Sequence, residues 1–334
     1  MIHLCIIMIP EQENTESKGT NPFPFNNLFL IKGYVSGRNE FWMYLLGLLA
    51  LFLGYLGFQA IILLPLLNIA QAQGISLAQI ARDANILFNP DAMGMNRSLM
   101  LALMMGMFVF AFVVFLLFSG KVQKKTLTSM LSGYERFRWK RYFFAFAVWG
   151  FLLIVFQVIA YISSPGDMEL RFEPGKFAVL FFVALILVPI QTGTEELLFR
   201  GYLMQGFSML FKNGIAGIVV TSVIFGLLHG SNPETEAHGF LLMMPYYILF
   251  GAFLGVLTLL DEGAELAMGV HFANNFFSAL LVCSKNSVLQ TDAIFYTQVE
   301  KPGVELISWA ILAVICFFVF YKTYRLSNWK LLIR

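Results

Sequence analysis

Two adjacent glutamates and an arginine follow a long apolar run in the second half of the chain. The run FAVLFFVALILVPI ends at Ile190, and the segment TEELLFRGYLMQG begins four residues later. Glu196 and Arg200 are four residues apart, the spacing at which a carboxylate and a guanidinium can pair on one face of a helix. Glu195 points about 100° away from Glu196 on a helix. One glutamate can therefore be structural while the other stays free for proton transfer or metal binding.

Two histidines and an asparagine add polar groups to other apolar runs. His229 ends the run VVTSVIFGLLH, and His271 begins HFANNFF, in which Asn275 follows four residues later on the same helix face. An ionisable side chain in hydrocarbon costs on the order of 2.5–3.5 kcal/mol, so such groups should face a cavity or a partner. We therefore expect these residues to meet inside the protein.

The composition is that of a membrane protein. Hydrophobic residues make up 58% of the chain, charged residues only 13%, and the mean hydropathy is +0.74. Soluble domains are not composed in this way. The net charge of +2 is not that of a nucleic-acid-binding protein, so no nucleic acid is expected as a partner. The apolar composition makes the lipid bilayer the expected partner.

Apolar runs of about 20 residues, long enough to cross a bilayer, recur along the chain. We predict an all-α polytopic membrane protein with about eight transmembrane helices, in which the later spans form the bundle that holds the polar residues. The predicted spans are 41–69, 98–119, 142–162, 177–209, 214–230, 239–260, 264–284 and 304–323.

Four regions follow from these spans. We expect a polar N-terminal tail at 1–40, N-terminal transmembrane helices at 41–176, the polar helical core at 177–284, and a last helix with a basic tail at 285–334. With both termini placed inside and Arg200 set aside, 15 lysines and arginines lie inside and six outside. Such residues in short loops favour the cytoplasmic side. We expect an integral protein of the cytoplasmic (inner) membrane with both termini cytoplasmic.

Helix arithmetic indicates that Glu195 and His229 lie at one depth. Glu195 precedes Lys212 in the turn FKNG by 17 residues, and His229 follows Lys212 by 17. Equal offsets in an antiparallel helix pair give equal depths, about 25 Å from the turn. The two side chains can therefore meet.

The same arithmetic places His271 and Asn275 at a shallower depth. They lie only about 10–16 Å beyond a helix start near Ala264. Either the FKNG turn protrudes from the bilayer, or the DEG turn at 261–263 sits deep. The sequence leaves both possibilities open.

Three ordered motifs resemble those of the CPBP intramembrane proteases, which include CAAX prenyl endopeptidases and bacterial Abi and bacteriocin-processing members. The family's Glu-Glu-x-x-x-Arg falls on Glu195, Glu196 and Arg200, its Phe-x-x-x-His on Phe225 and His229, and its His-x-x-x-Asn/Asp on His271 and Asn275. The resemblance covers roughly 177–282. It implies an endopeptidase that cleaves a prenylated, leader-bearing or membrane-anchored protein, with the polar core as its catalytic region.

The implied reaction suits these residue types. Amide hydrolysis needs an activated water, a proton for the leaving amine and donors for the developing oxyanion. Glu195 and His229 suit the first two tasks, and no serine or cysteine nucleophile is needed. His271 and Asn275 can donate to the oxyanion, while Glu196 and Arg200 support the helix.

A metal is the competing mechanism for the same residues. Two histidines and a carboxylate form a ligand set found in catalytic zinc sites. If a metal is used, we expect zinc bound by Glu195, His229 and His271. The sequence lacks His-Glu-x-x-His, and the two histidines lie 42 residues apart on different helices. We therefore favour water activation without a metal.

Two other kinds of function fit buried polar residues. A proton-coupled transporter would also bury Glu, His and Arg near the midplane, although it should show internal repeats or paired broken helices. A non-catalytic scaffold or immunity protein could keep the same fold without turnover. Each residue also has a simpler reading, since an intramembrane Glu–Arg pair or an asparagine often only joins helices.

Overall fold

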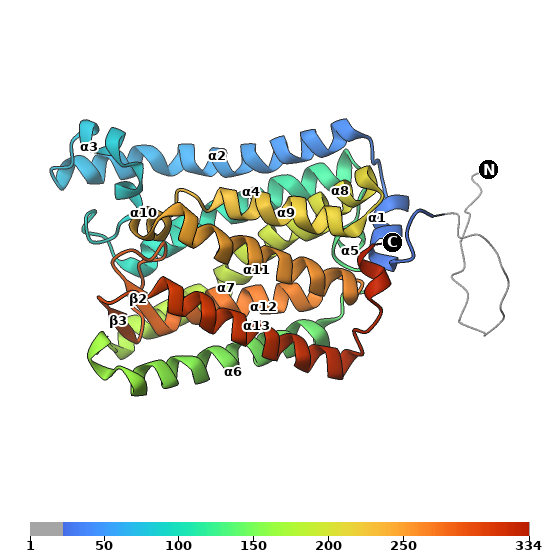
Figure 1. Cartoon of the computed structure of the whole chain (residues 1–334). Coiled ribbons are helices and arrows are strands. Elements are labelled where there is room, and N and C mark those ends of the chain that lie inside the picture. The colour runs from blue at the N-terminus through green and yellow to red at the C-terminus, as the bar shows by residue number, and fades with distance from the viewer. Residues whose placement is uncertain (1–22, 334) are drawn as a thin grey trace.

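Helices make up nearly all of the regular structure. The computed structural model describes residues 23–333. The α-helices are α1 (Leu28–Val35), α2 (Phe41–Ala72), α3 (Leu77–Arg82), α4 (Arg97–Lys121), α5 (Leu127–Leu131), α6 (Trp139–Ser163), α7 (Pro174–Glu196), α8 (Gln205–Phe211), α9 (Gly214–Leu228), α10 (Pro233–His238), α11 (Phe240–Leu260), α12 (Glu265–Leu281) and α13 (Pro302–Tyr324). Between α7 and α8 lies a π-helical segment, η3 (Leu197–Met204). The predicted all-α polytopic fold is confirmed (Figure 1).

Three short 3₁₀ turns and a small sheet complete the described structure. The turns are η1 (Ala84–Phe88), η2 (Pro165–Asp167) and η4 (Trp329–Leu332), and the strands are β1 (Met168–Leu170), β2 (Val282–Ser284) and β3 (Phe295–Thr297). β3 is the middle strand, antiparallel to β1 and parallel to β2. The sheet therefore ties the α6–α7 connection to the α12–α13 connection.

Six helices within residues 23–333 are long and apolar enough to cross a membrane. They are α2, α4, α6, α11, α13 and the continuous unit α7–η3–α8. All eight predicted spans correspond to helical segments whose ends lie within three residues of the predicted ones. However, α9 has 15 residues and α12 has 17, fewer than the roughly 20 that a bilayer requires. These two helices are the shorter members of the bundle.

The continuous unit α7–η3–α8 is much longer than a bilayer is thick. It has 38 residues, which would span about 57 Å as a regular helix against a hydrocarbon core of about 30 Å. A π-helix pairs residue i with i+5, so η3 changes which way the following residues face. π-helical turns often occur at functional sites, and this one directly follows Glu196.

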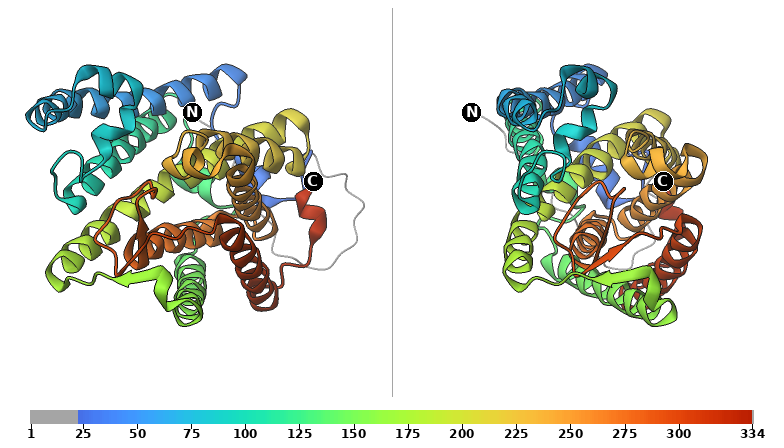
Figure 2. Two further views of the ribbon diagram at one scale, coloured as in Figure 1. Left: turned by 60° about the vertical axis from the view of Figure 1, so that its left-hand side comes forward. Right: turned by 90° about the vertical axis from the view of Figure 1, so that its left-hand side faces the viewer.

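α12 lies inside the bundle. It packs against α6, α7 and α11, and the view along the bundle in Figure 2 shows it enclosed by other helices. Gly269 lets the backbones of α12 and α6 touch, because a Cβ at this position would collide with the carbonyl oxygen of Tyr142. Small residues allow such close approach between membrane helices.

The turn between α11 and α12 sits deep in the protein. The backbone N–H of Ala264 donates to the carbonyl oxygen of Leu131, in the connection from α4 to α6, at 2.8 Å. Asp261 and Glu265 at this turn are only 4% and 0% exposed. The buried turn explains how α12 can be short at this end and still place His271 at the level of Glu195.

Ion pairs lock this turn to the start of α6. Arg138 Nη2 lies 2.6 Å from Glu265 Oε2 and 2.9 Å from Asp261 Oδ2, and Arg141 pairs with Asp261 as well. Burial raises the pKa of Asp261 to about 7, although the two arginines oppose the shift. The start of α12 is therefore fixed by charge as well as by packing.

The first forty residues are not simply a polar tail. α1 lies within this region, and its Phe29 and Leu30 are fully buried against a cluster that includes Met204 and Leu259. The side chain of Asn27 donates to the carbonyl oxygen of Leu259 at 2.8 Å. The prediction of a tail is wrong for residues 23–35, because Phe25, Phe29 and Leu30 are buried against the bundle. Residues 1–22 lie outside the described part of the chain.

Candidate active site

Two buried side chains, those of Arg200 and His271, bind the carboxylate of Glu196. Its Oε1 accepts from Arg200 Nη1 at 2.8 Å and from His271 Nδ1 at 2.7 Å. Arg200 Nη2 donates to the carbonyl oxygen of Gly251 on α11 at 3.0 Å. Glu196, Arg200 and His271 are 0%, 1% and 2% exposed. The predicted Glu196–Arg200 pair is present, and it also holds His271 and α11.

Glu195 approaches the other side of the His271 ring. Its Oε2 lies 3.6 Å from His271 Nε2, and its side chain is 15% exposed. This distance is too long for a direct hydrogen bond, and it is the spacing at which a bridging water should be considered. The Glu196 carboxylate can only accept, so Nδ1 of His271 carries a hydrogen and Nε2 is the nitrogen that faces Glu195.

Two side-chain amides connect Asn275 to Glu195. Asn275 Nδ2 donates to Gln191 Oε1 at 3.1 Å, and Gln191 Nε2 donates to Glu195 Oε1. Gln191 is 6% exposed, and the sequence analysis did not identify it as a site residue. A signal was present, because Gln191 precedes Glu195 by four residues and therefore shares its helix face.

His229 lies outside this connected set. Its Nδ1 is 2.7 Å from the carbonyl oxygen of Phe225, which makes Nδ1 the donor, and its ring stacks on Tyr247 at a centroid distance of 4.4 Å. The Phe225 ring contacts both imidazoles, with centroids 4.5 Å from His229 and 6.1 Å from His271.

The expected direct meeting of His229 and Glu195 is not found, since no hydrogen bond or ion pair joins them within residues 23–333. Equal depth does not ensure that two side chains face each other, and His229 faces the carbonyl of its own helix. Of the six predicted site residues, the structure therefore connects Glu195, Glu196, Arg200, His271 and Asn275 and leaves His229 beside them.

The side chains do not fit the zinc alternative as they are placed. In the described part of the chain, no group of three or more His, Cys, Asp and Glu side chains is arranged to hold a metal ion. Glu195 and His271 approach each other, but within residues 23–333 no hydrogen bond or ion pair brings His229 to either of them. The expected ligand set of Glu195, His229 and His271 is thus not assembled, and we derive no reaction step through a metal.

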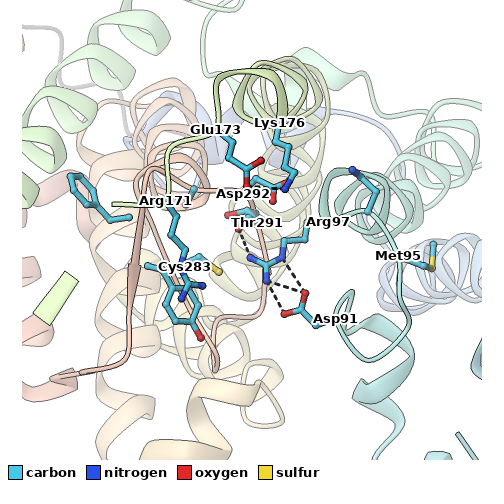
Figure 3. A pocket seen from close by; sticks show the side chains of 13 residues that line it. Asp91, Met95, Arg97, Arg171, Glu173, Lys176, Cys283, Thr291 and Asp292 are labelled. Atoms are coloured by element: carbon cyan, nitrogen blue, oxygen red, sulfur yellow. Dashed lines mark hydrogen bonds and ion pairs between the residues drawn. The ribbon is translucent and has the colours of Figure 1, made fainter. Parts of the chain in front are cut away.

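A charged cavity lies away from these residues, at the end of the bundle that carries the sheet. It has a volume of about 360 Å³, and its lining includes Arg97, Arg171, Lys176 and Cys283 (Figure 3). Arg97 Nη2 pairs with Asp91 at 2.7 Å, and Arg171 and Lys176 pair with nearby glutamates. None of the six predicted site residues lines this cavity.

An apolar hollow is lined in part by residues of α7 and α12, the two helices that carry Glu195 and His271. Its volume is about 430 Å³, and its lining is entirely apolar, with side chains from α6, α7 and α12 that include Phe181, Phe276 and Phe277. Phe276 directly follows Asn275 in the sequence. A bilayer-embedded apolar group could therefore lie next to the polar site.

Comparison with known proteins gives a family. The family model described as type II CAAX prenyl endopeptidase Rce1-like matches residues 174–277. Uncharacterized protein YyaK of Bacillus subtilis (strain 168) is 31% identical over 256 residues, which cover 76% of this chain and 82% of that protein. No solved structure matches the chain significantly.

A helical bundle with buried, mutually paired Glu, Arg and His side chains defines a polytopic membrane protein with an intramembrane polar site. The matched residues 174–277 contain all six predicted site residues. The chain belongs to the CPBP family, to which CAAX prenyl endopeptidases belong. Membership of this family supports a function of the CAAX-type intramembrane protease class.

Replacing Glu196 by glutamine should destabilise the fold, because Arg200 would stay buried without its counter-charge. We expect a loss of about 3–5 kcal/mol, seen as a lower unfolding temperature of the purified protein in detergent. The matched control is Glu169→Gln, which breaks the exposed pair with Arg171 and should leave the unfolding temperature unchanged. A Glu196→Gln protein as stable as the wild type would contradict the structural role of this carboxylate.

Proposed function

We propose that this protein is an intramembrane endopeptidase that hydrolyses a peptide bond with a water molecule activated by Glu195. One observation carries the proposal: Glu195 Oε2 and His271 Nε2 face each other 3.6 Å apart within the helical bundle. The other polar atoms of these side chains, Oε1 and Nδ1, are engaged by Gln191 and Glu196. The two free atoms thus face a common position suited to water.

Glu195 acts as the general base in this scheme. A water held between Oε2 and Nε2 of His271 gives a proton to Oε2 while its oxygen bonds to the peptide carbonyl carbon. The π electrons of the carbonyl move onto its oxygen, which becomes an oxyanion. A positioned general base typically contributes about 10²–10⁴-fold to the rate.

The oxyanion receives hydrogen bonds from the α12 side chains. Asn275 has two side-chain N–H groups and uses one of them on Gln191, which leaves the other for the oxyanion. His271 serves as a donor in its imidazolium form, which the Glu196 carboxylate at Nδ1 stabilises: the Nε2–H group holds the water oxygen before the attack, then donates to the oxyanion, and its proton stays on the ring throughout. Such preorganised donors are worth most in a dry site.

Collapse of the tetrahedral intermediate breaks the carbon–nitrogen bond and releases the amine. The amine nitrogen takes the proton that Glu195 carries, so the base is restored. We assign His229 to the leaving-group side, where its Nε2 can accept a hydrogen bond from the departing amine, because its Nδ1 is engaged by the Phe225 carbonyl. The sequence analysis expected His229 to supply this proton; in the proposed scheme Glu195 supplies it, and the substrate has to bring the amine close to His229 as well.

We propose that the substrate carries an apolar or lipid-modified segment beside the scissile bond. The apolar hollow of about 430 Å³ is lined by Phe276 and Phe277, which follow Asn275 on α12, and has no polar lining. A prenylated protein, a leader peptide and a membrane anchor each supply such a segment. The Rce1-like match supports the prenylated class.

We also propose that the protein lies in the cytoplasmic membrane with both termini on the cytoplasmic side. α1 and the end of α13 lie at the same end of the bundle (Figure 1), and Asn27 Nδ2 donates to the Leu331 carbonyl oxygen at 3.2 Å. The excess of lysine and arginine on this side supports the orientation.

Glu195→Gln tests the proposed function. Glutamine keeps the size of the side chain but cannot take a proton, so cleavage should fall at least about 10²-fold, while the unfolding temperature stays unchanged. The assay uses purified protein in liposomes with prenylated and membrane-anchored peptides. Retained cleavage in the variant, or a folded wild type that cleaves none of the peptides, would contradict the proposal.

Asn275→Asp separates the metal-free mechanism from the metal alternative. The carboxylate loses both N–H donors, so turnover should fall about 10²–10³-fold, the usual cost of losing one oxyanion donor. A chelator should leave the wild type active. If Asn275 were instead a weak metal ligand, aspartate would bind the metal better. An active Asn275→Asp protein that contains metal and is silenced by a chelator would overturn our mechanism.

A reporter fused to the C-terminus should be active only on the cytoplasmic side of the membrane. The expectation follows from the distribution of lysine and arginine, which favours cytoplasmic loops. Paired fusions of a cytoplasm-active and an export-active reporter measure it, with a fusion after β1 (Met168–Leu170) as the control for the opposite side. Signal from the opposite side at the C-terminus would reverse the proposed orientation.

A further inference from the structure

We infer that Gln191 is a positioning residue that orients the Glu195 carboxylate, and that it acts at the end of a hydrogen-bond chain running from Trp149 through Asn274 and Asn275. The inference rests on the proposed function, because it explains how the general base is held. It assigns a role to three residues, Gln191, Asn274 and Trp149, outside the motifs that suggested the site.

The chain has four hydrogen bonds in one direction. Trp149 Nε1 donates to Asn274 Oδ1 at 3.3 Å, and Asn274 Nδ2 donates to Asn275 Oδ1 at 3.2 Å. Asn275 Nδ2 donates to Gln191 Oε1 at 3.1 Å, and Gln191 Nε2 donates to Glu195 Oε1. The chain starts on α6, crosses α12 and ends on α7.

The two ends of the chain dictate how the three amides are oriented. The Trp149 indole can only donate, and the Glu195 carboxylate, when ionised, can only accept. Asn274 must therefore present its oxygen to Trp149 and its NH₂ to Asn275. Each following amide must do the same, so that the last NH₂ points at Glu195. Amide orientations normally have to be assigned from the hydrogen-bond network, and here the network permits only one.

Breaking this hydrogen-bond chain should cost free energy, because Trp149 and Gln191 are buried. Trp149 is fully buried and Gln191 is 6% exposed. A buried polar group that loses its partner costs more than the bond itself contributed, and bonds aligned in one direction polarise one another. The dipoles of three amides therefore point their positive ends at the carboxylate.

The consequence for the reaction is that Glu195 has one bound oxygen and one free oxygen. Gln191 holds Oε1, so Oε2 is the atom left to face His271 Nε2 at 3.6 Å. Without Gln191, the carboxylate can rotate about its last bond, and neither oxygen is fixed. Correct placement of a reacting group accounts for a large part of enzymatic rate, so the loss should appear in kcat.

Gln191→Met removes both the donor and the acceptor while keeping an unbranched side chain of similar length. We expect kcat to fall about 10- to 100-fold, the range expected for losing a hydrogen bond to a charged group, with KM unchanged. Gln191→Glu keeps the size and the acceptor but removes the donor when ionised, so its kcat should also fall. Thr192→Val is the matched control, since within residues 23–333 the Thr192 hydroxyl bonds only to the Val188 carbonyl, and it should keep wild-type kcat.

A double-mutant comparison separates positioning from a general effect on stability. If part of the effect of Asn275 is transmitted through Gln191, Asn275→Ala should cost less in the Gln191→Met protein than in the wild type. Infrared difference spectra give a readout without turnover. The carboxylate band that Glu195→Gln abolishes should shift in Gln191→Met and stay in place in Thr192→Val.

Failure of this inference is distinguishable from failure of the proposed function. If the wild type cleaves, Glu195→Gln does not, and folded Gln191→Met keeps wild-type kcat, then Gln191 has no positioning role and the protease assignment stands. Strictly additive effects of Gln191→Met and Asn275→Ala, or an unshifted carboxylate band, would equally overturn the inference. A wild type that cleaves none of the peptides overturns both.

Discussion

The arrangement of the core depends on one buried carboxylate, that of Glu196. An ionised carboxylate without partners would cost far more inside a helical bundle than any single packing contact contributes. Arg200 neutralises it from the same helical unit, and His271 reaches it from α12. Arg200 in turn uses its second amino group on the carbonyl of Gly251 in α11. Three elements therefore have to meet at fixed rotations and depths for this charge to be buried.

Bringing His271 to that depth constrains the rest of the bundle. α12 has to begin inside the protein, because His271 is only six residues beyond its first residue, Glu265. The backbone polar groups and acidic side chains of the preceding turn need partners there. The α4–α6 connection supplies them, through the Leu131 carbonyl and the guanidinium of Arg138. Two charge clusters at different levels thus set both the axial position and the rotation of α12, and Gly269 permits the close contact with α6 that results.

Local spacing was enough to predict some of this from the sequence. The helices and the Glu196–Arg200 pair follow from apolar runs and from an i, i+4 relation, which depend only on neighbouring residues. The sequence did not decide between the two possible depths of α12. That depth is set by contacts with the α4–α6 connection, which lies more than 120 residues away in sequence. The equal offsets of Glu195 and His229 predicted their depth but not the direction in which each side chain points. The His229 side chain points to the Phe225 carbonyl of its own helix. Gln191 lies four residues before Glu195, a spacing that is visible in the sequence. Its hydrogen bond to Asn275 on another helix, which marks it as part of the site, is visible only in the structure.

The neighbouring glutamates have different chemistry because of the donors around them. Glu196 is fully buried and accepts from a guanidinium and an imidazole, so its charge is already compensated. Glu195 is partly exposed and receives a neutral amide at one oxygen, which fixes its direction without supplying a counter-charge. The His271 ring stands between them, with Nδ1 bound to Glu196 and Nε2 facing Glu195. A displacement of this ring would therefore disturb both glutamates at once, which is why, in the proposed mechanism, the groups that hold α12 in place matter to the reaction without touching the substrate.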